Sequence, residues 1–104
     1  MIILYKNLNY FYQEQMTQNN PIIDRIKRRI FELAKFHNLR KGESLSVQNI
    51  TSSLMKESNG PVEKGPEISA TINQLIAEGL FTAKNADPAI FLTDLGYKYI
   101  EENL

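Results

Sequence analysis

The side chains that most often carry out nucleophilic or metal chemistry are scarce in this chain. Its 104 residues include one histidine and no cysteine. A zinc site or a cysteine–histidine nucleophile needs such groups in combination, and the chain has no second one to complete either. His37 follows Ile30 and Leu33 at helical spacing, and it is explained most simply as a boundary residue at a helix end. These residues predict a protein that is not an enzyme and that has no cofactor and no metal.

A segment at residues 60–65 has the two-glycine spacing of a phosphate-binding loop. In such a loop a lysine follows the second glycine, whereas Pro66 occupies that place here. The residues before the segment also have a helical rather than a strand-like pattern. We therefore predict a turn at this place and no nucleotide site.

Basic side chains that could bind phosphate are concentrated in one short run. The net charge is zero, but residues 1–52 hold eight basic and four acidic groups, and residues 53–104 hold four and eight. The only concentrated basic stripe consists of Arg25, Lys27, Arg28 and Arg29, and such a stripe is typical of proteins that meet nucleic acid. Acidic residues alternate with it at four-residue steps, so a solvated helix face explains the same run more simply.

Hydrophobic periodicity predicts three helices in the first three quarters of the chain. Asn20 followed by Pro21 indicates the start of a helix over about 21–37. A second helix is expected over about 47–57, with Met55 facing inward, and a long connection after it. A third helix is expected over about 66–78, ending at Gly79, which can adopt the left-handed backbone conformation of a helix end.

Short strands complete the predicted fold. Residues 44–46 are expected to form the first strand, and residues 80–84 and 90–92 a hairpin with its tip at 85–89. Thr93 is the expected N-cap of a last helix, with Asp94 in its first turn, where the helix dipole favours an anion.

Two motifs in residues 75–100 resemble the closing half of a winged helix-turn-helix domain of the small prokaryotic regulator type. One is the run Leu75-Ile76-Ala77-Glu78-Gly79-Leu80-Phe81, where a helix ends at glycine and passes straight into a strand. The other is the run Leu92-Thr93-Asp94-Leu95-Gly96-Tyr97, where a strand enters a helix through a leucine-threonine step. The resemblance covers residues 21–104. It implies a mainly α fold with a three-helix core, a two- to three-stranded wing and a C-terminal helix.

The resemblance also implies a function, namely a transcriptional regulator that places the 66–78 helix in the major groove of DNA. Asn73 and Gln74 are the base-reading candidates because a carboxamide can both donate to and accept from adenine. Ala70 would let the helix backbone come close to the bases. The candidates for contacts with the DNA backbone are Lys64, Ser69, Thr71, Lys84, Asn85, Arg25, Arg28 and Arg29.

Residues 1–20 form a separate N-terminal aromatic segment ahead of the predicted domain. Their apolar run is too short for a membrane span and lacks the pattern of a signal peptide, so a cytoplasmic protein is expected. The segment either covers the domain's own flank or forms a symmetric homodimer contact, which we favour. A pocket for a small-molecule effector beneath it is a further alternative. The dimer candidates are Leu4, Tyr5, Leu8, Phe11 and Tyr12.

The competing prediction is a winged-helix module that binds another protein and no DNA. The acidic second half of the chain, which contains the helix and wing that would meet DNA, favours this alternative. Salt separates the two predictions, because phosphate binding weakens steeply as salt rises and an apolar protein contact does not.

Overall fold

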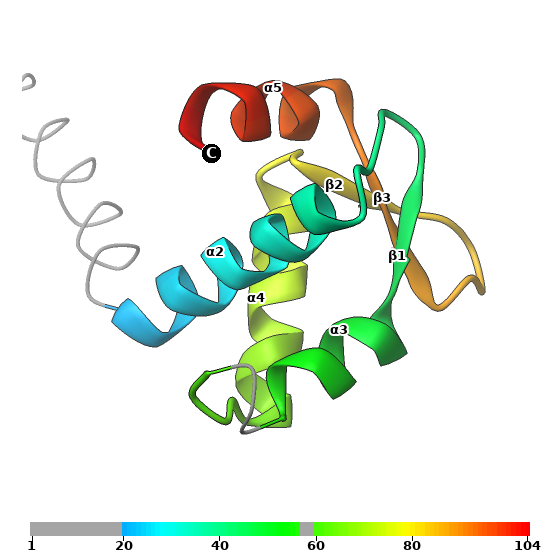
Figure 1. The fold of residues 1–104 in the computed structure, drawn as a ribbon. Helices are drawn as coiled ribbons and strands as arrows, with labels where there is room; N and C mark the ends of the chain where they lie inside the picture. Colours follow the sequence, from blue (N-terminus) through cyan, green and yellow to red (C-terminus); the bar gives the residue numbers. More distant parts are fainter. Residues whose placement is uncertain (1–19, 57–59) are drawn as a thin grey trace, which may run out of the picture.

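The computed structural model describes residues 20–56 and 60–104, and these form a mainly α domain with a small antiparallel sheet (Figure 1). Along the chain, α2 (Pro21–Phe36) is followed by strand β1 (Ser44–Ser46) and helix α3 (Val47–Leu54). Helix α4 (Gly65–Ala77), the strands β2 (Phe81–Ala83) and β3 (Ala89–Leu92), and helix α5 (Asp94–Asn103) complete it. In the described part of the chain, no helix is long and apolar enough to cross a membrane.

Helix α2 is set at both ends by local hydrogen bonds. The side chain of Asn20 accepts from the Ile23 amide at 3.2 Å, which caps the first turn, and Pro21 occupies a position whose amide needs no partner. At the other end Asn38 takes a positive φ of 53°, and the Leu39 amide reaches back to the Ala34 carbonyl at 2.9 Å. The predicted helix over about 21–37 is confirmed.

The three strands pair in the order β1-β3-β2, all antiparallel. Leu45 lies opposite Ile90, and Phe81 opposite Leu92, so these buried side chains face the helices. Phe91 alternates with them and lies on the outer face of the sheet, between Ser44 and Thr82. The predicted strand at 44–46 and the predicted hairpin are both confirmed.

The core is built around α2, which crosses in front of α4 in Figure 1 with α5 above it and α3 below. Phe31 is fully buried at its centre, with its ring 5.4 Å from that of Phe81 and 4.6 Å from that of Tyr99. The ring therefore joins α2 to both the sheet and α5. The buried cluster comprises Ile26, Ile30, Phe31, Ala34, Leu45, Ile50, Leu54, Ile68, Ile72, Leu75, Leu80, Phe81, Ile90 and Leu92.

Helix α4 ends at Gly79, as predicted, and leads at once into β2. Gly79 has a φ of +77°, and the Leu80 amide bonds to the Leu75 carbonyl at 3.1 Å, which closes the helix end. Thr93 then caps α5: its hydroxyl accepts from the Gly96 amide at 3.0 Å and lies 2.6 Å from the Gly79 carbonyl oxygen. The start of α5 is thereby tied to the end of α4.

Helix α3 is shorter than predicted, because it ends at Leu54 rather than near residue 57. Met55 is the C-cap, with its amide bonded to the Thr51 carbonyl at 3.0 Å, and its side chain is 47% exposed. The prediction that Met55 faces inward is therefore wrong. The Leu54 carbonyl accepts from the Glu63 amide at 3.0 Å, so an acceptor at the end of the helix has a partner outside the helix.

The predictions for residues 1–19, including the dimer candidates Leu4, Tyr5, Leu8, Phe11 and Tyr12, lie outside the described residues.

Candidate nucleic-acid interface

Helix α4 buries one side against the core and leaves the opposite side open. Ile68, Ile72 and Leu75 are buried. The exposed positions recur every three or four residues, so they share one stripe of the helix. We call this stripe the α4 outer face. It consists of Pro66, Ser69, Ala70, Asn73 and Ala77, and none of these side chains is charged.

Asn73 lies near the middle of the α4 outer face. It is exposed, and within residues 20–56 and 60–104 its carboxamide has no hydrogen-bond partner. Its neighbours one turn away on either side are Ala70 and Ala77, whose short side chains do not screen it. The carboxamide is thus free to pair with an incoming donor and acceptor, as base reading requires.

Gln74 is not presented in the same way as Asn73. It is half-buried, and its amide donates to Glu78 Oε2 at 3.3 Å. Glu78 in turn accepts from Lys27 Nζ of α2 at 2.6 Å. The structure therefore places Gln74 at the edge of α4 that faces α2, within a polar network, and not beside Asn73 as a second free carboxamide.

Thr71, predicted to contact a DNA phosphate, is fully buried. Its hydroxyl donates to the Glu67 carbonyl at 2.8 Å, which satisfies the group inside the core. A phosphate cannot reach it, so this prediction is wrong. Ser69 and Lys64, the other two candidates near the start of α4, are exposed.

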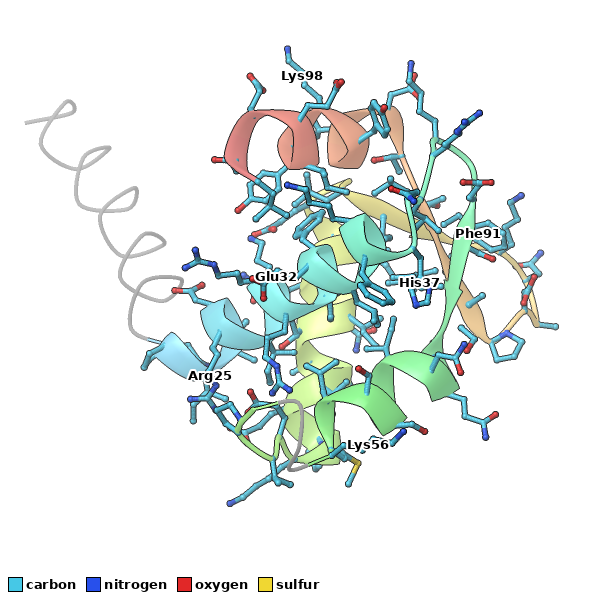
Figure 2. The ribbon with its side chains drawn as sticks, in the orientation of Figure 1. Arg25, Glu32, His37, Lys56, Phe91 and Lys98 are labelled. Atoms are coloured by element: carbon cyan, nitrogen blue, oxygen red, sulfur yellow. The ribbon has the colours of Figure 1, made fainter. Side chains whose placement is uncertain are left out.

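The basic stripe of α2 is largely used inside the molecule. Arg25 donates from Nε and Nη2 to the two carboxylate oxygens of Glu63, at 2.7 and 2.5 Å, and Arg29 Nη1 reaches Glu63 Oε2 at 3.0 Å. Figure 2 shows Arg25 near the start of α2, beside the connection that leads to α4. Within the basic stripe, only Arg28 has an exposed side chain and no ion pair with another described residue. Arg25 and Arg29 therefore have a structural role, and phosphate contact by either of them stays a prediction.

The ion pairs shift the protonation equilibria of their members. The hydrogen bonds from Arg25, and then those from Arg29, hold the pKa of Glu63 below its ordinary value, against the opposing effect of burial. The same contact with Glu63 raises the pKa of Arg25. Glu63 is therefore a buried carboxylate that stays ionised because two guanidinium groups surround it.

The hairpin tip carries the two remaining candidates, Lys84 and Asn85, and both are exposed. Lys84 Nζ lies 4.2 Å from the centroid of the Phe91 ring, on the outer face of the sheet (Figure 2). An exposed cation–π contact of this kind contributes only about 0.5–1 kcal/mol, so a phosphate could draw the ammonium away. The Pro88 carbonyl accepts from the Val47 amide at 2.9 Å and joins the tip to the start of α3.

Two groups of residues were missed by sequence reasoning. One is Glu63, which stood out only as part of the rejected phosphate-loop pattern, since its arginine partners are more than thirty residues away. The other is an exposed polar stripe on and after α3, whose four-residue spacing was a usable signal. That stripe consists of Gln48, Ser52 and Lys56.

Comparisons with protein-family models, with curated proteins and with solved structures gave no match.

Proposed function

We propose that this protein is a winged-helix transcriptional regulator of the cytoplasm that binds double-stranded DNA with α4 in the major groove, as a homodimer. The order of elements supports the proposal: α3 and α4 follow β1, and the hairpin of β2 and β3 follows α4 directly. A helix is the element that a major groove accommodates, and a hairpin beside it can contact the flanking backbone.

The observation that carries the proposal is Asn73 on the α4 outer face. It is a free carboxamide on a helix whose other exposed residues are small and uncharged, so the helix backbone can approach base edges closely. A bidentate contact from an asparagine to adenine contributes about 1–3 kcal/mol of discrimination. We assign base reading to Asn73, with Ala70 beside it, and backbone contacts to Lys64, Ser69, Lys84, Asn85 and Arg28.

We expect the electrostatic contribution to DNA affinity to be small. Arg25 and Arg29 are paired to Glu63, and Lys27 is paired to Glu78, so Arg28 is the one member of the α2 basic stripe assigned to phosphate, together with Lys64 and Lys84. Two or three neutralised phosphates per protomer give a slope of about −2 to −3 in a plot of log affinity against log salt concentration, and a dimer doubles it.

The test is fluorescence anisotropy with pooled random duplex DNA at two salt concentrations. We expect Lys64→Ala and Lys84→Ala to weaken binding to all sequences and to reduce the salt slope by about 1 per protomer each, which is about 2 for the dimer. Asn73→Ala should reduce discrimination among sequences selected by the wild type. The matched controls are Lys98→Ala and Asn103→Ala on α5, both at exposed positions, which should bind as the wild type does. Absence of binding even at low salt would reject the proposal.

The internal use of the basic stripe also favours a second function, a module that binds another protein. A groove of about 470 Å³ between α2 and α3 is lined by Leu33, Phe36 and Leu54 among others, and Phe36 is 80% exposed. Exposed aromatic side chains are typical anchors of protein contacts. Binding of a protein partner that is insensitive to salt and is lost in Phe36→Ala would support this function over DNA binding.

A further inference from the structure

Glu63 is the buried acidic residue of the described structure, with a side chain that is 1% exposed. Both of its carboxylate oxygens are occupied. Oε1 accepts from Arg25 Nη2, whereas Oε2 accepts from Arg25 Nε and from Arg29 Nη1. A guanidinium that donates two parallel hydrogen bonds to a carboxylate fixes the orientation of the two groups as well as the distance between them. The contact therefore constrains where this part of the backbone can lie.

The position of Glu63 in the chain makes this constraint important. It lies in the connection between α3 and α4, directly before Lys64, which is the N-cap residue of α4. The Lys64 side chain makes no capping hydrogen bond, so the start of α4 is not fixed by the usual local means. The connection is also longer than the tight turn of a compact helix-turn-helix, and its length alone does not determine the angle between the helices.

Three further contacts act on the same short segment. Arg29 Nη1 donates to the Pro61 carbonyl at 2.6 Å, and the Glu63 amide donates to the Leu54 carbonyl at 3.0 Å. Gly60 faces the Arg29 side chain, since a β-carbon on it would lie 3.6 Å from Nη2. Residues 60–63 are thus held against both α2 and the end of α3.

We propose that Glu63, with Arg25 and Arg29, forms an ionic clamp that positions the N-terminal end of α4 against α2. Arg25 and Arg29 are four residues apart, so they project from the same side of α2 and converge on one carboxylate. The clamp replaces the short turn and the capping side chain that would otherwise set the start of α4. In some proteins a buried ionic group favours one arrangement among several of similar energy, and we assign that role to Glu63 here. Glu63 is then a positioning residue for Lys64, Ser69 and Ala70.

The clamp is tested first in the free protein, by amide hydrogen exchange. Glu63→Gln keeps the shape of the side chain but removes its charge. We expect the amides of residue 63 and Ile68, both near the start of α4, to exchange at least tenfold faster. The amides of Leu75 and Ile76, near its end, should change much less. A uniform increase over the whole core, or no increase at residue 63 and Ile68, would overturn the proposal.

A matched control breaks the other ion pair between α2 and α4. Glu78→Gln removes the contact to Lys27 at the C-terminal end of α4, and it should leave exchange at Ile68 unchanged. If Glu63→Gln does not fold, Arg25→Lys serves instead, because it keeps the charge and loses the two parallel hydrogen bonds. The Arg25 side chain is 44% exposed, so we expect the Arg25→Lys variant to fold. It should accelerate exchange at Ile68 in the same pattern, and wild-type exchange in that variant would contradict the clamp.

The consequence for ligand binding rests on the proposed function. If α4 binds DNA, Glu63→Gln should weaken binding although residue 63 touches no DNA, and it should reduce the discrimination that Asn73 provides. The exchange measurement needs no DNA, so the clamp and DNA binding can fail independently. If Glu63→Gln accelerates exchange but the wild type binds no DNA, the proposed function is rejected and the clamp stands. If the wild type binds DNA but Glu63→Gln leaves exchange unchanged, the clamp is rejected and the function stands.

Discussion

Gly96 of α5 packs directly on the carbonyl group of Leu80, the residue that precedes β2. A β-carbon at position 96 would overlap the Leu80 carbonyl oxygen and would also lie 2.7 Å from Leu92 Cδ1. The close approach lets Thr93, at the start of α5, bond to the end of α4. The absence of a side chain at position 96 is therefore what allows α5 to lie on the domain.

We predict that Gly96→Ala lowers the free energy of unfolding. A new methyl group against backbone atoms typically costs 1–3 kcal/mol, and better helix propensity returns no more than about 1. A net loss of about 1–2 kcal/mol should lower the Tm by roughly 5–15 °C. Thermal unfolding followed by circular dichroism measures it.

The matched control is Gly65→Ala in the first turn of α4, where a β-carbon would meet nothing within 4 Å. It should be neutral or slightly stabilising. Equal Tm values for Gly96→Ala and the wild type would show that α5 is not held as closely as described.

Thr93 provides a second test of how α5 is attached. Its hydroxyl caps the helix through the Gly96 amide at 3.0 Å and also lies 2.9 Å from the Leu80 carbonyl oxygen. Thr93→Ala should cost about 1–2 kcal/mol in urea unfolding, whereas Thr93→Ser keeps the hydroxyl and should cost much less. If serine proved as damaging as alanine, the hydroxyl would not be the stabilising group.

Two phenylalanines of α2 are predicted to differ sharply. Phe31 is fully buried and its ring contacts those of Phe81 and Tyr99 at tilted angles, whereas Phe36 is 80% exposed. Phe31→Leu loses both ring contacts and should cost about 1–3 kcal/mol. Phe36→Leu should change the unfolding free energy by less than about 0.5 kcal/mol. Chemical denaturation of the two variants in parallel measures the difference, and similar losses in both would contradict the described packing of α2.

Local signals in the sequence predicted the start of α2, the end of α4 and the start of α5 correctly. Asn20, Gly79 and Thr93 each act through the backbone within a few residues, by a side-chain cap or a left-handed φ. Such effects depend little on the rest of the fold. The exposed position of Asn73 was predicted for a similar reason, because the buried face of α4 follows directly from its helical period.

Contacts between distant segments could not be predicted in the same way. The full burial of Phe31 does not follow from helical period, because a single helical stripe does not show that β2 and α5 cover a second side of α2. The hydroxyl of Thr71 can be buried because it donates to the Glu67 carbonyl, which offsets the free-energy cost of removing a polar group from water. The pairing of Glu63 with Arg25 needed the tertiary fold itself.

The Glu63 pairing makes a prediction about pH. The folded state holds the pKa of Glu63 below its ordinary value of 4.5, mainly through Arg25, whereas the unfolded chain has no such contact. As pH falls through and below 4.5, the unfolded state takes up a proton before the folded state does, so stability declines. The contribution of Glu63 is thus fully present above its unfolded pKa and is lost as pH falls through its folded pKa.

Urea unfolding of the wild type and Glu63→Gln between about pH 3 and pH 7 would measure this contribution. Glutamine cannot ionise, so the two proteins should differ most near neutral pH and converge as the solution becomes acidic. Glu102→Gln, an exposed position on α5, is the control and should follow the wild type at every pH. A difference between wild type and Glu63→Gln that stays constant, or that widens in acid, would mean that the carboxylate of Glu63 is not stabilised by its two arginines.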